Sequence, residues 1–349
     1  MKKIVFKNQN YIFSFLIAFS GGLIAHLLNF PLPWMFGPLI LCGLISAFGK
    51  NIYLSEKPRP ICRALLGCAI GANFSPEVIE KASEILVSLM ILPVFVLLMI
   101  SSTFLFLFKW MKMDLKTSIY GSLPGGLNEM VALGNEVGVD TRKITLIHST
   151  RIVIVVICAS MLVMFVPEFS DNITQEIKLF ENILNLPIVF FISYLGYFLG
   201  KKINLPGYSI IGPMCLSGSL HIFDLVQAKP SFIIIIIVQI FLGSYLGVQF
   251  KNISIKDVLG PMLSGLCTTL ISFIPLYLSI LILFHLGFEY DLLSMILSYS
   301  PGGQPEMNIL ALSVGADMVF VGTHHVFRVF LVIMLAAIIQ KFIKKSNLD

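Results

Sequence analysis

The sequence has very little charge for its length. Only 12% of its 349 residues are Asp, Glu, Lys or Arg, whereas 57% are apolar, and an ordinary soluble domain carries about 25% charged residues. Several apolar runs, such as 84–108 and 258–286, exceed the roughly 20 residues that cross the hydrocarbon layer of a bilayer. These values exclude a soluble globular domain. They predict an all-α polytopic membrane protein whose first partner is the lipid bilayer.

The sequence also lacks paired metal ligands. Its six cysteines stand singly in apolar segments without a CxxC pair, and its six histidines form no HxxH or HxxxH pair. Only His324 and His325 are adjacent, and neighbouring residues on a helix point about 100° apart, which makes a poor bidentate site. We therefore expect the cysteines to pack as small apolar residues, and we expect neither a metal nor a cofactor.

The sequence also has no long run of basic residues, although the net charge is +5. The basic residues form short clusters between apolar runs, and such clusters set the orientation of a membrane protein, so no nucleic-acid partner is predicted. Lys2, Lys3 and Lys7 precede an apolar run without a small-x-small cleavage site. This pattern predicts an uncleaved first helix.

One block of the sequence occurs twice, at 123–153 and 300–330, without a gap and at an offset of 177. The matched residues are a Pro-Gly-Gly triplet, a Glu, and a His and Arg spaced i, i+3, namely Pro124, Gly125, Gly126, Glu129, His148 and Arg151, with Pro301, Gly302, Gly303, Glu306, His325 and Arg328. Two other segments repeat at offsets of 175 and 176. We therefore predict two membrane repeats, residues 1–170 and 171–349.

Each half predicts five long helices, with the PGG stretch between the fourth and the fifth. The expected helices lie at about 11–28, 32–49, 59–74, 84–108 and 143–166, then at about 186–200, 207–223, 231–250, 258–286 and 318–340. If each PGG stretch spans the membrane, each half has six crossings and the halves are parallel. If each enters and returns, each half has five crossings and the halves are inverted.

The basic clusters decide between these topologies, because Lys and Arg accumulate on the cytoplasmic side. Five crossings per half keep every basic cluster inside and place the acidic linker 167–182 outside. Six crossings would instead place Lys201 and Lys202 outside. We predict two inverted-topology repeats of about five transmembrane helices, each with a re-entrant broken helix at its PGG triplet, and cytoplasmic termini.

The paired PGG-x-x-EM blocks, their downstream VG-x-D and H-x-x-R, and the paired Gly-Pro helices resemble the AbrB duplication family over nearly the whole chain. The resemblance implies a protein of the bacterial inner membrane with a transport-like core. Members of that family carry labels such as ammonia monooxygenase or regulator. An unrelated soluble DNA-binding regulator shares the name, but this sequence does not resemble it.

Glu129 and Glu306 are expected in the first turn of the helix that follows each triplet. The unpaired N–H groups of a helix start favour a negative charge. Either carboxylate could merely cap its helix. An ionisable side chain inside a membrane costs about 2.5–3.5 kcal/mol on insertion scales, so we favour a role in an ion or proton path.

The two His-Arg pairs each lie on one face of a long apolar helix. Arg151 and Arg328 could pair with the nearby glutamates or bind an anionic ligand, and the sequence leaves both roles open. Only the second block has His324 and Gln304 as additional hydrogen-bonding groups, which favours Arg328 as the ligand anchor. Asp140 and Asp317 are each predicted to cap the helix that follows.

Gly-Pro pairs interrupt one apolar helix in each half, at Gly37–Pro38 and Gly212–Pro213. They predict kinks, and the freed carbonyls could also bind a substrate or cation. GxxxG motifs at 67–71 and 243–247 predict close helix packing.

Inverted repeats with broken helices are typical of secondary transporters. We therefore expect a secondary transporter and not an enzyme. Its movement of a small solute would be coupled to H⁺ or Na⁺, and the solute is anionic if an arginine binds it. One alternative is a membrane protein that regulates gene expression indirectly. A membrane monooxygenase is disfavoured because clustered copper or iron ligands are missing. A homo-oligomeric state is left open.

Overall fold

The computed structural model describes residues 2–28, 30, 32–165, 182–249, 255–288 and 290–346. All regular secondary structure in these ranges is helical. Six of the helices are long and apolar enough to cross a membrane, and they contain Asn10–Leu27, Ala82–Trp110, Thr141–Leu162, Ile183–Lys202, Leu259–His285 and Met318–Ile343. The predicted all-helical membrane protein is confirmed at this level.

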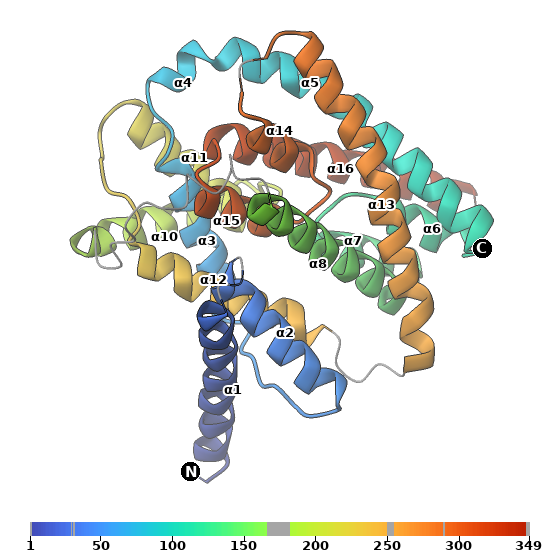
Figure 1. Cartoon of the computed structure of the whole chain (residues 1–349), viewed down its shortest axis with the longest axis horizontal. Helices are drawn as coiled ribbons and strands as arrows, with labels where there is room; N and C mark the ends of the chain where they lie inside the picture. Colours follow the sequence, from blue (N-terminus) through green and yellow to red (C-terminus); the bar gives the residue numbers. More distant parts are fainter. Residues whose placement is uncertain are drawn as a thin grey trace. The chain divides into compact units, whose positions relative to one another are not determined.

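Helices form at all ten expected places (Figure 1). In the first half they are α1 (Lys2–Leu27), α2 (Pro33–Ala47), α3 (Pro58–Gly71), α5 (Ala82–Leu105) and α8 (Thr141–Phe165). In the second half they are α10 (Leu186–Lys202), α11 (Tyr208–Ile222), α12 (Phe232–Val248), α13 (Ile255–His285) and α16 (Met318–Ser346). Because α2, α3, α11 and α12 have only 14 to 17 residues, the number of crossings stays a prediction.

Shorter elements complete the described chain. They are α4 (Glu77–Glu80), the π-helical turn η1 (Phe106–Trp110), α6 (Leu115–Ser122), α7 (Leu127–Asn135), the 3-10 turn η3 (Ile183–Asn185), α14 (Leu292–Tyr299) and α15 (Gln304–Val314). The linker 167–182, on which the predicted topology depends, lies outside the described residues except for Asn182.

The chain forms two compact units, and each unit takes one segment from each half of the sequence. Unit 1 comprises Met1–Val78 and Ser160–Ser254, and unit 2 comprises Ile79–Ala159 and Ile255–Asp349. The repeat boundary expected at 170/171 falls in a stretch that the structure does not describe. Because each unit combines an early and a late segment of the chain, the compact units are not the two sequence halves.

Unit 1 is built by an exchange between the halves, because each GxxxG helix packs on the Gly-Pro helix of the other half. Helix α3 packs on α11, and α12 packs on α2. A Cβ at Gly71 would lie 2.7 Å from the backbone N of Gly218, and one at Gly247 would lie 2.9 Å from the backbone N of Gly43. The predicted close packing at both GxxxG motifs is confirmed, since only glycine permits these approaches.

The Gly-Pro pairs also lie at close helix contacts in unit 1. A Cβ at Gly37 would lie 2.6 Å from the backbone N of Gly22 in α1, and one at Gly212 would lie 3.3 Å from the Cα of Gly200 in α10. Helices α2 and α11 continue through their prolines. Packing accounts for both glycines, and carbonyl binding of a ligand there stays a prediction.

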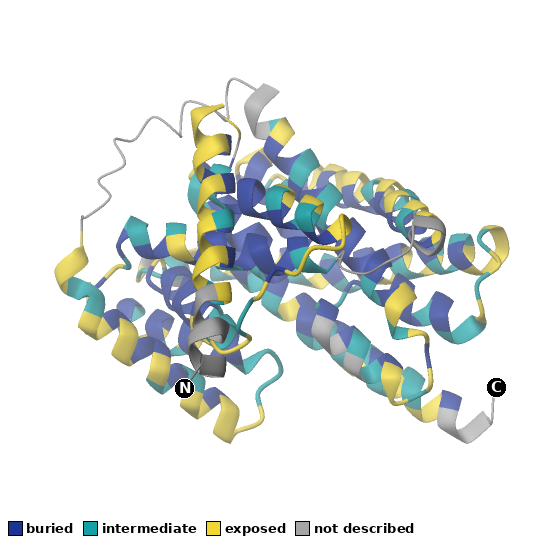
Figure 2. Cartoon of the chain, turned by 90° about the horizontal axis from the view of Figure 1, so that it is seen from below, coloured by how far each residue is buried: buried dark blue, intermediate teal, exposed yellow. Residues whose placement is uncertain are grey.

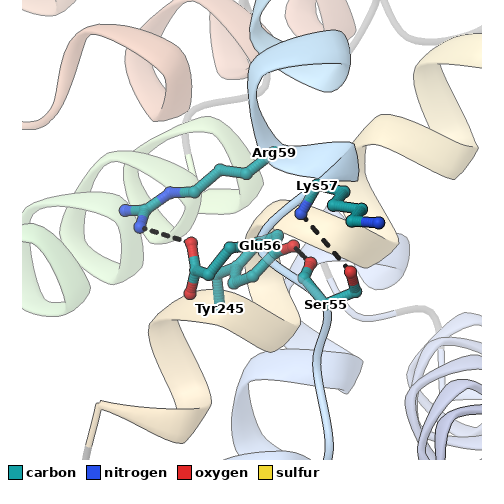
Figure 3. Close-up of polar contacts among 5 residues, drawn as sticks. All are labelled: Ser55, Glu56, Lys57, Arg59 and Tyr245. Atoms are coloured by element: carbon teal, nitrogen blue, oxygen red, sulfur yellow. Dashed lines mark hydrogen bonds and ion pairs between the residues drawn. The ribbon is translucent and has the colours of Figure 1, made fainter.

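A polar cluster fastens the basic loop before α3 to α12 (Figure 3). The Tyr245 hydroxyl donates to the Ser55 carbonyl. The Arg59 guanidinium lies 5.3 Å from the centroid of the Tyr245 ring and pairs with Glu56 at 3.4 Å. A cation above an aromatic face is attracted by the ring quadrupole. The cluster therefore joins a loop of the first half to a helix of the second.

Many large apolar residues are exposed to the surroundings of the chain, and Figure 2 colours exposed residues yellow. The exposed fractions of Met90, Phe191 and Ile274 are 75%, 64% and 63%. Exposed apolar surface on this scale is unusual in soluble monomers and is expected where helices face lipid.

Candidate functional site

The helices of unit 2 break at both PGG triplets. Helix α6 ends at Ser122 and α7 begins at Leu127, while α14 ends at Tyr299 and α15 begins at Gln304 (Figure 1). Proline lacks a backbone donor and glycine permits an abrupt turn, so a helix cannot run smoothly through the triplet. We call residues 115–135 the first hairpin and residues 292–314 the second hairpin.

The first glycine of each triplet makes room for the methionine of the Glu-Met pair. A Cβ at Gly125 would lie 2.6 Å from Cε of Met130, and one at Gly302 would lie 2.8 Å from Sδ of Met307. Both methionines are fully buried. The PGG-x-x-EM spacing thus places a thioether over a glycine at the break in each hairpin.

Aspartates cap the helix starts around both hairpins. The Asp140 carboxylate accepts from the N–H of Arg142 at 3.0 Å, and the Asp317 carboxylate accepts from the N–H groups of Val319 and Phe320 at 2.9 Å. The two predicted caps are confirmed. Asp114 and Asp291, also 177 residues apart, cap α6 and α14 and were missed because single aspartates in polar loops are a weak signal.

Each repeated histidine donates to the end of the first short helix in its hairpin. His148 Nε2 lies 3.0 Å from the carbonyl O of Tyr120, and His325 Nε2 lies 3.0 Å from that of Leu297. Both rings are fully buried. Because a carbonyl oxygen only accepts, each Nε2 must carry the hydrogen.

The arginines bind the next free carbonyls of the same helix ends. Arg151 Nη1 donates to the Leu123 carbonyl at 3.3 Å. Arg328 Nη1 donates to the Ser300 carbonyl, and its Nη2 donates to the Gly302 carbonyl at 2.6 Å. The last carbonyls of a helix have no intrahelical partner and carry partial negative charge, so a cation stabilises them.

The second His-Arg pair is also internally connected. Arg328 Nη2 lies 2.8 Å from His325 Nδ1. The guanidinium can only donate, so His325 Nδ1 accepts while Nε2 donates to Leu297. This arrangement fixes a neutral His325 with its hydrogen on Nε2. In the first pair, His148 Nδ1 has no hydrogen-bond partner in the described part of the chain.

Glu306 lies in the first turn of α15, as predicted, and its side chain is buried with 6% exposed. A Cβ at Gly303 would collide with Oε2 of this carboxylate. The carboxylate therefore folds back over the helix start, where its charge is favoured. Glu129 begins α7 in the same way, but its side chain lies outside the described residues.

His324 contacts a buried hydroxyl pair instead of Arg328. Its Nε2 lies 2.8 Å from Ser88 Oγ, and its Nδ1 lies 2.7 Å from the Phe320 carbonyl. The Tyr299 hydroxyl donates to the Ser88 carbonyl at 2.7 Å. At the positions that match His324 and Tyr299 the first half has Ile147 and Ser122. This network therefore exists on one side of the repeat only. The sequence showed that His324 is unmatched, but Ser88 and Tyr299 were missed because no motif surrounds them.

The structure gathers the repeated Glu, His and Arg residues in unit 2, while the Gly-Pro pairs belong to unit 1. Nowhere in the described ranges do three His, Cys, Asp or Glu side chains form a group that could hold a metal ion. The chemistry available is hydrogen bonding by buried arginine, histidine, amide and carboxylate groups at helix ends.

Comparison with known proteins identifies the family to which the chain belongs. The model of a family described as "Transition state regulatory protein AbrB" matches residues 34–344. The chain belongs to the AbrB family. The resemblance inferred from the paired motifs is confirmed.

Two curated relatives align with this AbrB-family chain over most of their length. A Bacillus subtilis (strain 168) protein described as "Uncharacterized protein YhjN" is 24% identical over 350 residues, covering 91% of this chain and 89% of the relative. An Escherichia coli (strain K12) protein described as "Putative regulator AbrB" is 24% identical over 331 residues, covering 93% and 92%. Neither description names a solute or a reaction.

Proposed function

We propose that the protein is a secondary transporter of the bacterial inner membrane that moves a small polar solute coupled to H⁺ or Na⁺. The observation that carries the proposal is the pair of broken helices in unit 2, each held by a buried His and Arg at positions 177 residues apart. Irregular backbone at membrane depth is tolerated where protein groups satisfy it or where it lines a hydrated cavity. Paired broken helices are the usual substrate and ion sites of transporters built from repeats.

In the proposed architecture each half contributes five crossings and one re-entrant hairpin, so the halves are inverted and both termini are cytoplasmic. The support for it is the placing of the basic clusters, which all lie inside in this arrangement. Cysteines introduced in the 167–182 linker should react with an impermeant reagent from outside. Labelling only after permeabilisation, with 201–202 labelled from outside, would instead support parallel halves.

Glu129 and Glu306 are the proposed carriers of the coupling ion. In proteoliposomes the wild type should dissipate an imposed H⁺ or Na⁺ gradient when a transported solute is supplied. Glu306→Gln should abolish this flux while the purified protein keeps its elution profile and thermal midpoint. The control is Glu80→Gln, an exposed residue in α4. Full flux in both Glu129→Gln and Glu306→Gln would reduce the carboxylates to helix caps.

Indirect regulation of gene expression is the second candidate, because the Escherichia coli relative is described as a regulator. In this interpretation the protein changes transcription by moving an effector across the membrane. Transcripts altered by deleting the gene should then be restored by the wild type but not by Glu306→Gln. Restoration by a variant without flux would separate regulation from transport.

We further propose that the chain is not an enzyme. A monooxygenase would need clustered copper or iron ligands. Metal analysis of purified protein tests this, since copper or iron in stoichiometric amount would favour the monooxygenase.

A further inference from the structure

The second hairpin carries two amide side chains that the first hairpin lacks. Gln304 and Asn308 are spaced i, i+4 on α15, where α7 has Leu127 and Val131. Residues at this spacing are neighbours on one helix face. Both amides are buried, with 6% of Gln304 and none of Asn308 exposed.

The two amides leave one donor and one acceptor unused. Asn308 Nδ2 donates to the Gln304 backbone carbonyl at 2.7 Å, which fixes the orientation of the amide and leaves Oδ1 as its open atom. Neither Asn308 Oδ1 nor Gln304 Nε2 has a hydrogen-bond partner within the ranges that the structure describes. The same face of α15 therefore carries an unpaired N–H group on Gln304 and an unpaired C=O group one turn later on Asn308.

Structure alone does not account for this pair. Burying unpaired amide groups is unfavourable, and such groups usually have a partner. The first hairpin forms with two apolar residues at the same positions. In the second hairpin the break is held by Arg328 and His325 through backbone carbonyls, so the amides are not needed to hold it.

We propose that Gln304 and Asn308 bind a neutral group of the transported solute that offers an acceptor and a donor side by side, as a carboxamide does. The inference rests on the proposed transport function and names its substrate class. A carboxylate would satisfy Gln304 Nε2 but would face Asn308 Oδ1 with a second acceptor. An amidinium cation would satisfy Asn308 Oδ1 but would face Gln304 Nε2 with a second donor. Only the neutral group satisfies both atoms.

The start of α15 disfavours an anionic ligand. The Glu306 carboxylate already lies over this helix start, because a Cβ at Gly303 would collide with its Oε2. A second negative charge beside it would be repelled. Arg328 is engaged by backbone carbonyls, so the face requires no anionic ligand.

Three probes of nearly equal shape test the proposal: acetamide, acetate and acetamidinium. Purified protein in detergent is titrated with each at constant ionic strength, and the thermal midpoint is followed. Acetamide should stabilise the wild type at concentrations at least tenfold lower than acetate or acetamidinium. Gln304→Leu and Asn308→Val, which install the residues of the first hairpin, should each lose this response. The exposed Gln227→Leu should keep it.

A second kind of variant tests the proposal even if Gln304→Leu or Asn308→Val fails to fold. Gln304→Glu keeps the volume of the side chain and breaks no hydrogen bond of Asn308. It replaces the unpaired donor with a carboxylate oxygen, so both open atoms become acceptors and the preference should shift from acetamide to acetamidinium. Stronger stabilisation of the wild type by acetate or acetamidinium, or no response to any probe by folded wild type, would overturn the proposal.

The test is independent of flux. If acetamide binds through these residues but no neutral amide moves across proteoliposomes, the transport function fails and the binding site stands. If another class of solute is transported and acetamide does not compete with it, transport stands and the inference fails.

Discussion

The two hairpins of unit 2 share a backbone plan and differ in how completely it is stabilised. In both, a histidine and an arginine from the following long helix bind carbonyls at the break. In the second hairpin the arginine has three partners, including the histidine of its own pair. In the first hairpin Arg151 has one described hydrogen bond and His148 Nδ1 has none.

This comparison distinguishes contacts that stabilise the break from side chains that are available to a ligand. Contacts present in both hairpins serve the break itself, since a tethered cation satisfies the free carbonyls of a helix end. Groups present on one side only, such as Gln304 and Asn308 in the second hairpin and His324 in α16, are not required by the break. The sequence favoured Arg328 as the ligand anchor. Because Arg328 has more hydrogen bonds than Arg151, we now expect a structural role for Arg328. Which arginine anchors a ligand stays a prediction.

The largest expected effect is the loss of Arg328. Arg328→Gln strands two carbonyls and His325 Nδ1, and each buried acceptor without a partner costs about 1–3 kcal/mol. We expect a loss of about 3 kcal/mol or more, seen as a lower thermal midpoint in detergent. Arg151→Gln should lose about a third of that. Millimolar guanidinium should partly restore Arg328→Ala, because it can occupy the same carbonyls, whereas Na⁺ should not.

A reversed order would change the assignment. If Arg328→Gln stays stable and only its response to ligands disappears, while Arg151→Gln unfolds, the ligand anchor is Arg328 as the sequence favoured. Equal losses of stability would show that the number of hydrogen bonds made by each arginine does not determine how much it stabilises its hairpin.

Alanine at the first glycine of each triplet should destabilise the two hairpins about equally. In Gly125→Ala and Gly302→Ala the new methyl overlaps Met130 or Met307, and overpacking of this kind costs about 1–3 kcal/mol. Combining each change with Met→Ala at its partner should cost less than the sum of the two single changes. Additive losses in either hairpin would rule out the glycine-methionine contact there.

The network around His324 should matter on one side only. His324→Ile installs the residue of the first half and removes one of the two partners of Ser88 Oγ, with an expected cost of about 1–2 kcal/mol. Ile147→Leu, at the matched position, should cost less because no hydrogen bond is lost. An unchanged thermal midpoint in His324→Ile would show that the hydroxyl pair of Ser88 and Tyr299 is sufficient without the histidine.

Much of this architecture could be predicted from periodic apolar runs and from the internal repeat. The helices, the caps at Asp140 and Asp317 and the tight GxxxG packing follow from local rules. The pairing of α3 with α11 could not be predicted, because nothing in a GxxxG motif says which helix it packs against. The sequence also could not show that the arginines bind backbone carbonyls. A guanidinium donates to carboxylate and carbonyl oxygens alike, so the residue type does not identify the acceptor. Asn308 was missed because a single amide in an apolar helix has no motif around it.

The smallest expected effect concerns the caps of the first short helices and depends on pH. Partial burial raises the pKa of Asp114, but the hydrogen bond from the Thr117 N–H and the charge of Lys143 outweigh it, so the pKa is lowered overall. A carboxyl whose folded pKa lies below its unfolded value of about 3.9 adds stability above that value and loses it as pH falls through the folded pKa. Asp114→Ala should therefore cost about 1 kcal/mol at pH 6. The difference from wild type should shrink below about pH 4.

Asp291 supplies the matched comparison, because its carboxylate binds both the N–H and the hydroxyl of Ser294. Ser294 Oγ in turn accepts from the N–H of Asp317 at 2.7 Å, which links the starts of α14 and α16. Asp291→Ala should consequently lower the thermal midpoint more than Asp114→Ala at pH 6. If Asp114→Ala costs as much, or if its cost grows as pH falls, the cap of the first hairpin works by something other than the charge of Asp114.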